Sequence, residues 1–336
     1  MEIPVLPKKN ALGLIFKVDK QVGRGDVIDI ISDFQNGVMV KKQYQHEFCD
    51  GLGALLLTAS EWPSLGLSLP SRRVRVTNPL TQLLPGIRGF LQDLSQHETK
   101  WRHFDPLEKY HPDFSARRVF SHQSSQRILQ AAKRQNISLT AFMLWHLNSV
   151  ISENLMLPEQ KKSHWVLPIN MRRQKGEELR IENRISSVGL HFDKDLGAEE
   201  LGALYSATLN PVHAFANEIL TEILAMLGER RLLELARSRG KANSWTGIFT
   251  NLGQWDFPDS PQLDHWPLAV SITPPGGTPV LPIGAGIMSW RGHLSLSLRL
   301  HPALAAKQPE LPDRLLDAAR RSIENSVGDK TTLLHG

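Results

Sequence analysis

A predicted β-hairpin near the amino terminus constrains the fold more than any other feature of this sequence. Residues 26–34 alternate apolar and polar side chains, and residues 38–46 form a second run of strand type. Between them stands Gln35-Asn36-Gly37, and Asn-Gly between two such runs is typical of a tight hairpin turn. The chain therefore contains an antiparallel strand pair, which a purely parallel, doubly wound sheet does not provide.

Helices and further strands are expected on both sides of an irregular middle segment. Residues 11–18 read as a strand, and residues 53–62 read as a short helix that ends before Pro63. Residues 63–112 are irregular and rich in Pro, Gly and Ser, so they predict a long crossover with one helix at 86–96. The later predicted elements are helices over 124–134 and 138–155 (Ser138 as N-cap), two or three helices within 198–239 broken near Pro211 and Gly228, a helix over 311–326, and strands over 165–171, 184–192, 245–251, 267–273, 281–289 and 292–300.

This pattern predicts an α/β protein of the α+β type with mixed sheets, because hairpins occur alongside crossovers. The regular pattern resumes near residue 113. We therefore expect two domains: residues 1–112, an N-terminal lobe that ends in the crossover, and residues 113–336, a C-terminal lobe.

Composition excludes several classes of protein. The 336 residues are 41% hydrophobic and 22% charged, and no apolar run approaches the ~20 residues needed to cross a bilayer. The formal net charge of +5 comes from scattered basic pairs rather than a basic block, so no nucleic-acid partner is predicted. The single Cys cannot form an internal disulfide, and the amino terminus lacks the features of a secretory signal, so a cytoplasmic location is expected. No metal-binding motif is present, and no metal is expected.

The segment from His46 to Gly51 (HEFCDG) carries the most chemical information. His46 stands at the end of a predicted strand, where a rigid element can direct its imidazole into a cleft. A neutral imidazole with a pKa of ~6.5 can accept a proton from an alcohol or amine. Gly51 lets the backbone turn tightly, and Asp50 can orient the site. The segment predicts a general base at His46.

This segment resembles the HHxxxDG motif of the coenzyme A-dependent acyltransferases with the chloramphenicol acetyltransferase-like fold, a group that includes condensation domains of peptide synthetases, wax ester synthases and alcohol acyltransferases. Gln45 replaces the first His, and His46 occupies the position of the second, functional His. Residues 168–172 (PINMR) are similar to the family's P-[VI]-x-x-R segment. Weaker likenesses follow in the family's order at 183–192 (NRISSVGLHF), 249–253 (FTNLG) and 292–298 (GHLSLSL).

The resemblance implies a role for each matching residue. Arg172 pairs with Asp50, which is then a structural anion rather than a base, and Gly51 belongs to the same structural motif. Asn251 is a candidate donor to the oxyanion or to the thioester donor, and an Asn that simply ends its strand is an equal alternative. The implied architecture is two chloramphenicol acetyltransferase-like lobes with the site in a tunnel between them. The family carries a longer segment before the motif, so the first lobe is short or truncated, or the recorded start is internal to a longer chain.

The implied reaction is acyl transfer from a thioester to a hydroxyl or amine acceptor, with His46 as general base. The donor would be an acyl-CoA or an acyl-phosphopantetheine on a carrier protein, used as co-substrate with no permanently bound cofactor. An acyl carrier protein is then a candidate partner besides the small-molecule acceptor.

Several alternatives stay open. A lone His such as His46 is often structural, and Cys49 is the only thiol that could act as a nucleophile, although a free Cys is more often an inert small hydrophobe. The chain could instead be a catalytically inactive condensation-like module that binds an acyl carrier or partner protein, or a basic binding protein without acyl chemistry.

Overall fold

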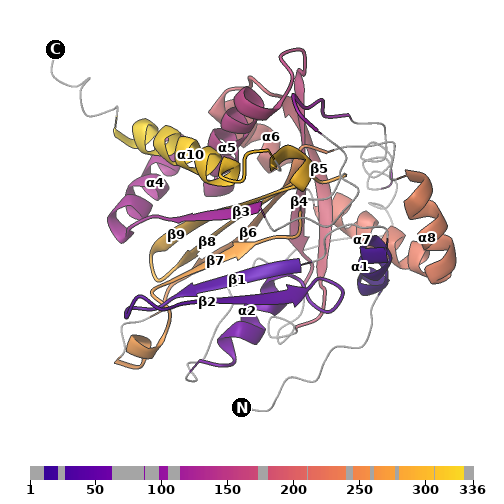
Figure 1. Ribbon diagram of the computed structural model, residues 1–336, viewed down its shortest axis with the longest axis horizontal. Coiled ribbons are helices and arrows are strands. Elements are labelled where there is room, and N and C mark those ends of the chain that lie inside the picture. Colours follow the sequence, from indigo (N-terminus) through magenta and orange to yellow (C-terminus); the bar gives the residue numbers. More distant parts are fainter. Residues whose placement is uncertain are drawn as a thin grey trace.

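The computed structural model describes residues 11–21, 27–62, 87, 98–104, 114–172, 181–209, 211–239, 245–257, 261–276, 280–305 and 307–328. These residues form two sheets with helices packed around them (Figure 1). Apart from residue 87, the helix predicted at 86–96 lies outside the described residues, as does most of the predicted crossover. The described helices are α1 (Ala11–Gln21), α2 (Gly51–Ala59), α4 (His122–Arg134), α5 (Leu139–Leu155), α6 (Ala198–Thr208), α7 (Pro211–Ala225), α8 (Gly228–Arg239), α9 (Pro302–Ala305) and α10 (Leu311–Gly328), with the 3₁₀ turn η2 (Pro261–His265).

The smaller sheet has three strands in the order β2-β1-β7. The predicted hairpin is confirmed, with β1 antiparallel to β2 and Gly37 in the left-handed conformation at φ +78°. β7 also pairs antiparallel with β1, although it comes from the distant C-terminal part of the chain. One strand of the later segment thus completes the sheet that the earlier segment begins. The domain boundary near residue 112 stays a prediction. The three strands are β1 (Val27–Asp33), β2 (Met39–Gln45) and β7 (Ala269–Thr273).

The larger sheet has six strands in the order β3-β9-β8-β6-β4-β5. Its pairs are antiparallel except for β4 with β6 and β6 with β8, which are parallel, so the predicted mixed sheet is confirmed. Helices α4, α5 and α10 cover one face of it (Figure 1). Its strands are β3 (Phe114–Val119), β4 (Lys162–Asn170), β5 (Ile185–Asp193), β6 (Gly247–Trp255), β8 (Ile283–Trp290) and β9 (His293–Leu300).

Strand β9 joins the two sheets through its alternating side chains. Its leucines, at positions 294, 296, 298 and 300, are buried in the core beneath the helices. The side chains between them face β7: Ser295 Oγ donates to the Val270 carbonyl at 2.9 Å, and Ser297 Oγ donates to the Ile272 carbonyl. Arg299 Nη1 donates to the Pro274 carbonyl at 3.0 Å, and Arg299 Nη2 donates to Asp29 of β1 at 2.6 Å. These specific polar contacts accompany apolar packing between the sheets, where β7 and β8 share one hydrophobic cluster.

The predicted helices and strands are mostly confirmed, and one assignment is wrong. Residues 11–18, read as a strand, belong to helix α1, which packs against α7 and α8 (Figure 1). The short apolar run there is compatible with either structure, and the distant helices stabilise the helical form. Ser138 caps α5 as expected, accepting a hydrogen bond from the Ala141 N–H at 3.1 Å.

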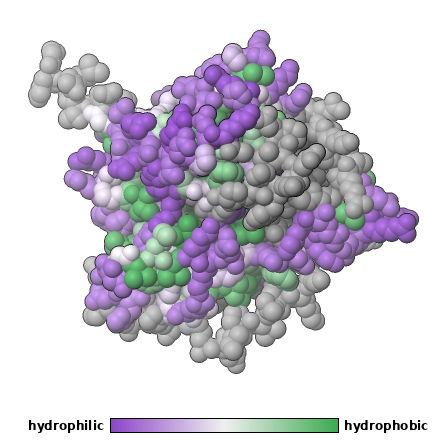
Figure 2. Space-filling model, in the orientation of Figure 1, coloured by the Kyte–Doolittle hydropathy of each residue, from purple (hydrophilic) through white to green (hydrophobic). Residues whose placement is uncertain are grey.

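The face seen in Figure 2 is mainly hydrophilic, and its hydrophobic areas are separate from one another. Among the described residues, no helix is both long and apolar enough to cross a membrane. No group of three or more His, Cys, Asp or Glu side chains in this part of the chain is arranged to hold a metal ion.

Candidate active site

His46 lies in the turn between β2 and α2. The turn is closed by the N–H groups of Phe48 and Cys49, which donate to the Gln45 carbonyl at 3.0 and 3.4 Å. The residue is only 4% exposed, and its ring centroid lies 3.8 Å from that of Phe16 on α1. The expectation of an accessible imidazole beside a tunnel is therefore wrong for this structure, because α1 places Phe16 over the ring.

Burial also fixes the protonation state of His46. It lowers the pKa of His46 to about 4, against the opposing influence of the Asp50 charge, so the imidazole is neutral at pH 7. Its Nδ1 atom is buried without a hydrogen-bond partner in the part of the chain that the structure describes. The site therefore holds a neutral imidazole with one nitrogen that no described group occupies.

Asp50 is the N-cap of α2 and the centre of a buried polar network. Its carboxylate accepts hydrogen bonds from the Gly53 N–H at 2.8 Å and from the Arg184 N–H at 2.9 Å. It also accepts two bonds from the Arg172 guanidinium, at 2.9 and 3.1 Å. The side chains of Asp50 and Arg172 are 0% and 2% exposed. The ion pair implied by the resemblance is present, and it leaves the carboxylate fully engaged in structure.

A second connection reaches the backbone of His46 itself. The side-chain Nδ2 of Asn183 donates to the His46 carbonyl at 2.6 Å. Arg172 donates further to the Glu182 carbonyl at 3.0 Å, so the segment around residue 183 and the turn after β2 are tied together at several points. Asn183 stands at the start of the 183–192 likeness, which is its one signal in the sequence, and its contact with His46 is visible only in the structure.

Gly53 allows the first turn of α2 to approach this segment. A Cβ atom at Gly53 would lie 1.9 Å from the Ile181 carbonyl oxygen, which leaves no room for any side chain. At Gly51, a Cβ atom would lie 2.7 Å from Cδ1 of Ile272 in β7. Gly53 is thus required by the backbone beside it, whereas at Gly51 the nearest atom is the end of an Ile side chain.

Cys49 points into the core beneath the small sheet. Its residue is 1% exposed, and burial, aided by the Asp50 charge, raises the pKa of the thiol to about 12. A thiol with this pKa is protonated at neutral pH and is a poor nucleophile. The structure agrees with the interpretation of Cys49 as an inert small hydrophobe.

Asn251 lies on β6 and already has partners for both ends of its amide. Its Nδ2 donates to Thr140 Oγ1 at 2.8 Å, and its Oδ1 accepts from the Gly253 N–H at 2.7 Å. The strand does not end here but continues to Trp255 past a β-bulge, with Gly253 at φ +87°. A donor role for Asn251 stays a prediction, and it would require the bond to Thr140 to break.

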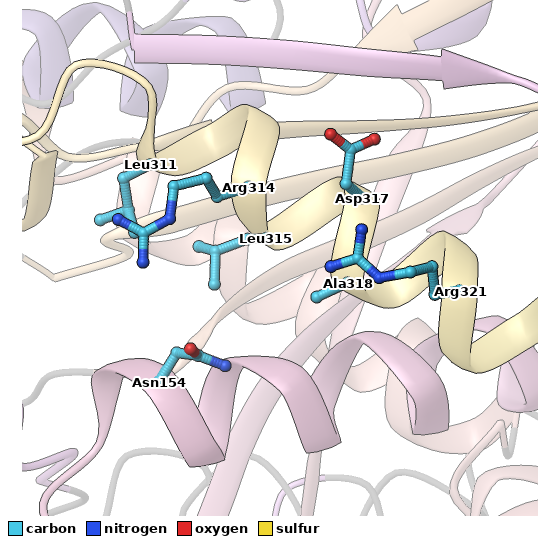
Figure 3. A pocket seen from close by; sticks show the side chains of 7 residues that line it. All are labelled: Asn154, Leu311, Arg314, Leu315, Asp317, Ala318 and Arg321. Atoms are coloured by element: carbon cyan, nitrogen blue, oxygen red, sulfur yellow. The ribbon is translucent and has the colours of Figure 1, made fainter.

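A cavity of about 240 Å³ lies elsewhere, between α5 and α10 (Figure 3). Asp317 at its edge is already paired with Arg118 at 2.7 Å. None of the residues singled out from the sequence lines this cavity, so it is not part of the candidate site. Its lining residues are Asn154, Leu311, Arg314, Leu315, Asp317, Ala318 and Arg321.

Solved structures with similar folds are synthetase domains and an acetyltransferase. The cyclization-docking bidomain of the EpoB nonribosomal peptide synthetase from Sorangium cellulosum aligns with a TM-score of 0.57 and 15% identity, over 86% of this chain and 60% of that chain. The trichothecene 15-O-acetyltransferase TRI3 from Fusarium sporotrichioides aligns with a TM-score of 0.57 and 9% identity, over 96% of this chain and 76% of that chain. The starter condensation domain of rhizomide synthetase RzmA, solved with C8-CoA and Leu-SNAC, aligns with a TM-score of 0.51 and 13% identity, over 86% and 65%.

The sequence matches no protein-family model and no curated protein sequence. At identities this low, structural likeness establishes the fold and leaves substrates open. The chain spans 60% of the length of the EpoB bidomain, so it is shorter than this neighbour. The resemblance seen in the motif is thus confirmed for the architecture: this chain has the mixed α/β fold of the coenzyme A-dependent acyltransferase superfamily, the chloramphenicol acetyltransferase-like fold.

Proposed function

We propose that this chain transfers an acyl group from a thioester to a hydroxyl or amine acceptor, with His46 as the general base. The observation that carries this proposal is the state of His46: a neutral imidazole whose Nδ1 has no hydrogen-bond partner among the described residues, held on a turn that Asp50, Arg172 and Asn183 fix in place. A general base must be neutral and must keep a nitrogen free of structural hydrogen bonds.

The proposed step needs no covalent enzyme intermediate. His46 takes the proton from the acceptor O–H or N–H as that atom attacks the thioester carbonyl carbon. The tetrahedral intermediate then collapses, the C–S bond breaks, and the imidazolium returns the proton to the leaving thiolate. Base catalysis of this kind contributes ~10² to 10⁴-fold, and holding both substrates together supplies further acceleration.

The nature of the donor and acceptor is proposed by analogy. The RzmA domain was solved with an acyl-CoA, and TRI3 is an O-acetyltransferase. For this chain we propose an acyl-CoA or a carrier-bound acyl-phosphopantetheine as the donor. An acyl carrier is then a candidate partner, and an alcohol or amine is the acceptor. Asn251 stays a proposed contact to the oxyanion or donor, because its Nδ2 already binds Thr140.

One observation favours the second candidate function, a catalytically inactive module that binds a carrier or partner protein. The ring of Phe16 lies against the only imidazole in the motif, so this structure offers no open approach to His46 from that side. Loss of turnover with retention of the Asp50–Arg172 network would fit a binding module of this kind.

An acyl-transfer assay separates the two. The purified chain is incubated with a pool of acyl-CoA thioesters and a pool of alcohols and amines, and mass spectrometry follows acylated products while a thiol reagent follows released CoA. We expect product formation by wild type and by Cys49→Ala, and none by His46→Ala. Equal product formation by His46→Ala and wild type would remove the proposed base. Binding of an acyl carrier without any turnover would favour the inactive module.

A further inference from the structure

Helix α1 contacts the candidate site through the side chain of Phe16. Phe16 lies with its ring centroid 3.8 Å from that of His46, and the two ring planes meet at 41°. The helix packs against α7 and α8, which belong to a part of the sequence some 200 residues away. Phe16 thus covers the imidazole from outside the motif that positions it.

The helix is only partly embedded in the protein. Leu12, Leu14, Ile15 and Phe16 are all of intermediate exposure, and Val18 and Gly13 alone among the α1 residues with described side chains are buried. A helix of 11 residues is too short to be stable by itself in water, so its packing contacts decide whether it forms. Such weakly buried segments open more readily than a core element.

One acidic residue fastens α1 to its neighbour. The carboxylate of Glu229, in the first turn of α8, accepts from Lys17 Nζ at 2.5 Å and from Gln21 Nε2 at 2.6 Å. Lys17 and Gln21 are four residues apart and therefore lie on one side of α1. The Lys17 and Glu229 side chains are 30% and 38% exposed, so water and salt weaken this contact.

We propose that α1 is a displaceable cover over His46, fastened by Glu229, and that Phe16 blocks the imidazole while the cover is closed. The covering itself follows from the geometry. Its consequence, an autoinhibited acyltransferase, rests on the proposed function of His46. The cover also accounts for part of the burial that lowers the pKa of His46, so its removal returns the imidazole toward the range where it is a better base at neutral pH.

Chemical modification of histidine tests the cover without any assay of activity. Diethyl pyrocarbonate reacts with neutral imidazoles that solvent can reach, and peptide mass spectrometry gives the rate at each His. His103 is exposed and serves as the fast reference. His146 is the matched slow reference, because it is 1% exposed and burial lowers its pKa to about 4, as for His46. His146 lies between α5 and α10, where it would report global unfolding.

The test compares Phe16→Ala and Glu229→Gln with wild type and with Glu234→Gln. Glu234 is the control, an exposed α8 carboxylate that pairs with Arg230 of the same helix. We expect His46 to react about tenfold faster in both test variants, as for a local opening made easier, while His146 stays protected and Glu234→Gln matches wild type. An unchanged His46 rate in both folded variants would overturn the cover. Equal acceleration of His46 and His146 would overturn it too, because the opening would then be global.

Activity measurements on the same variants keep the two proposals separable. Faster modification of His46 together with higher kcat/KM for thioester transfer supports both the cover and the catalytic role. Faster modification with no transfer by any variant leaves the cover standing and removes the proposed function. Transfer by wild type with no change in modification or kcat/KM in either variant keeps the function and overturns the cover.

Discussion

The guanidinium of Arg172 holds the carboxylate of Asp50 through two hydrogen bonds, at 2.9 and 3.1 Å, between segments 122 residues apart in the sequence. Both side chains are buried, and the same carboxylate caps α2 through the Gly53 N–H. This pair therefore joins the motif turn to the end of β4. The position of His46 therefore depends on a contact that forms only when the chain is folded.

Removing either partner of this pair should strongly destabilise the protein. Asp50→Ala and Arg172→Ala each leave a buried charge without its counterion, which costs about 3 to 5 kcal/mol. Arg184→Ala is the control: residue 184 binds Asp50 through its backbone N–H, which alanine keeps. Urea unfolding measures all three variants. A fully stable Asp50→Ala variant would show that the pair does not hold the turn.

Replacement of His46 should abolish acyl transfer and also affect stability. We expect His46→Ala to lose about 10² to 10⁴-fold in kcat/KM because no other described group replaces the base. The residue is buried, so truncation also leaves a cavity and should cost about 1 to 3 kcal/mol, contrary to the expectation of an exposed side chain. Steady-state kinetics and urea unfolding give the two values. Activity within about tenfold of wild type would contradict the assigned role.

Cys49 should be dispensable for catalysis. Its thiol is buried, and its pKa is raised to about 12, so it offers almost no thiolate at pH 7. Cys49→Ala should keep most of the activity, with sequential rather than ping-pong kinetics. Intact mass spectrometry after incubation with a thioester donor alone should show unmodified protein. An acyl adduct on Cys49 that the acceptor removes would replace this mechanism.

Gly53 should tolerate no side chain. In Gly53→Ala the new Cβ would lie 1.9 Å from the Ile181 carbonyl oxygen. The next carbonyl along the chain, that of Glu182, accepts a hydrogen bond from Arg172, which holds this backbone near Asp50. Overpacking of this kind costs about 1 to 3 kcal/mol, and here it should also displace the turn and reduce activity. Gly328→Ala is the matched control, because nothing lies within 4 Å of its Cβ. Equal stability of the two variants would contradict the close packing.

Stability should fall as the pH decreases from about 6.5 toward 4. The pKa values of His46 and His146 are lowered to about 4 by burial, so in this interval the unfolded chain binds protons that the folded chain does not. Each can cost up to about 3 kcal/mol. His146→Gln, which keeps a polar group near Ser322, should reduce the loss between pH 7 and 4.5 by about half. An identical loss in wild type and variant would contradict these shifts.

Local sequence signals predicted most of the fold, since alternation, turn residues and the Ser138 cap act within a few positions of each other. They failed for α1, where the run ALGLIF suits either a strand or a helix, and packing on α7 and α8 makes it helical. The ion pair of Asp50 with Arg172 followed from the family resemblance. The contacts of Phe16 and Asn183 with His46 could not be predicted, because only the tertiary structure brings them to the motif.

Three side chains of β9 donate to carbonyls of alternate residues along β7 and just past its end. They are the hydroxyl groups of Ser295 and Ser297 and the guanidinium of Arg299. Each of these donors is buried, so sliding or tilting the small sheet would leave several polar groups without partners at once. These buried bonds therefore oppose movement of one sheet against the other. If His46 acts as the proposed base, the element whose displacement would admit substrates is helix α1 rather than the small sheet.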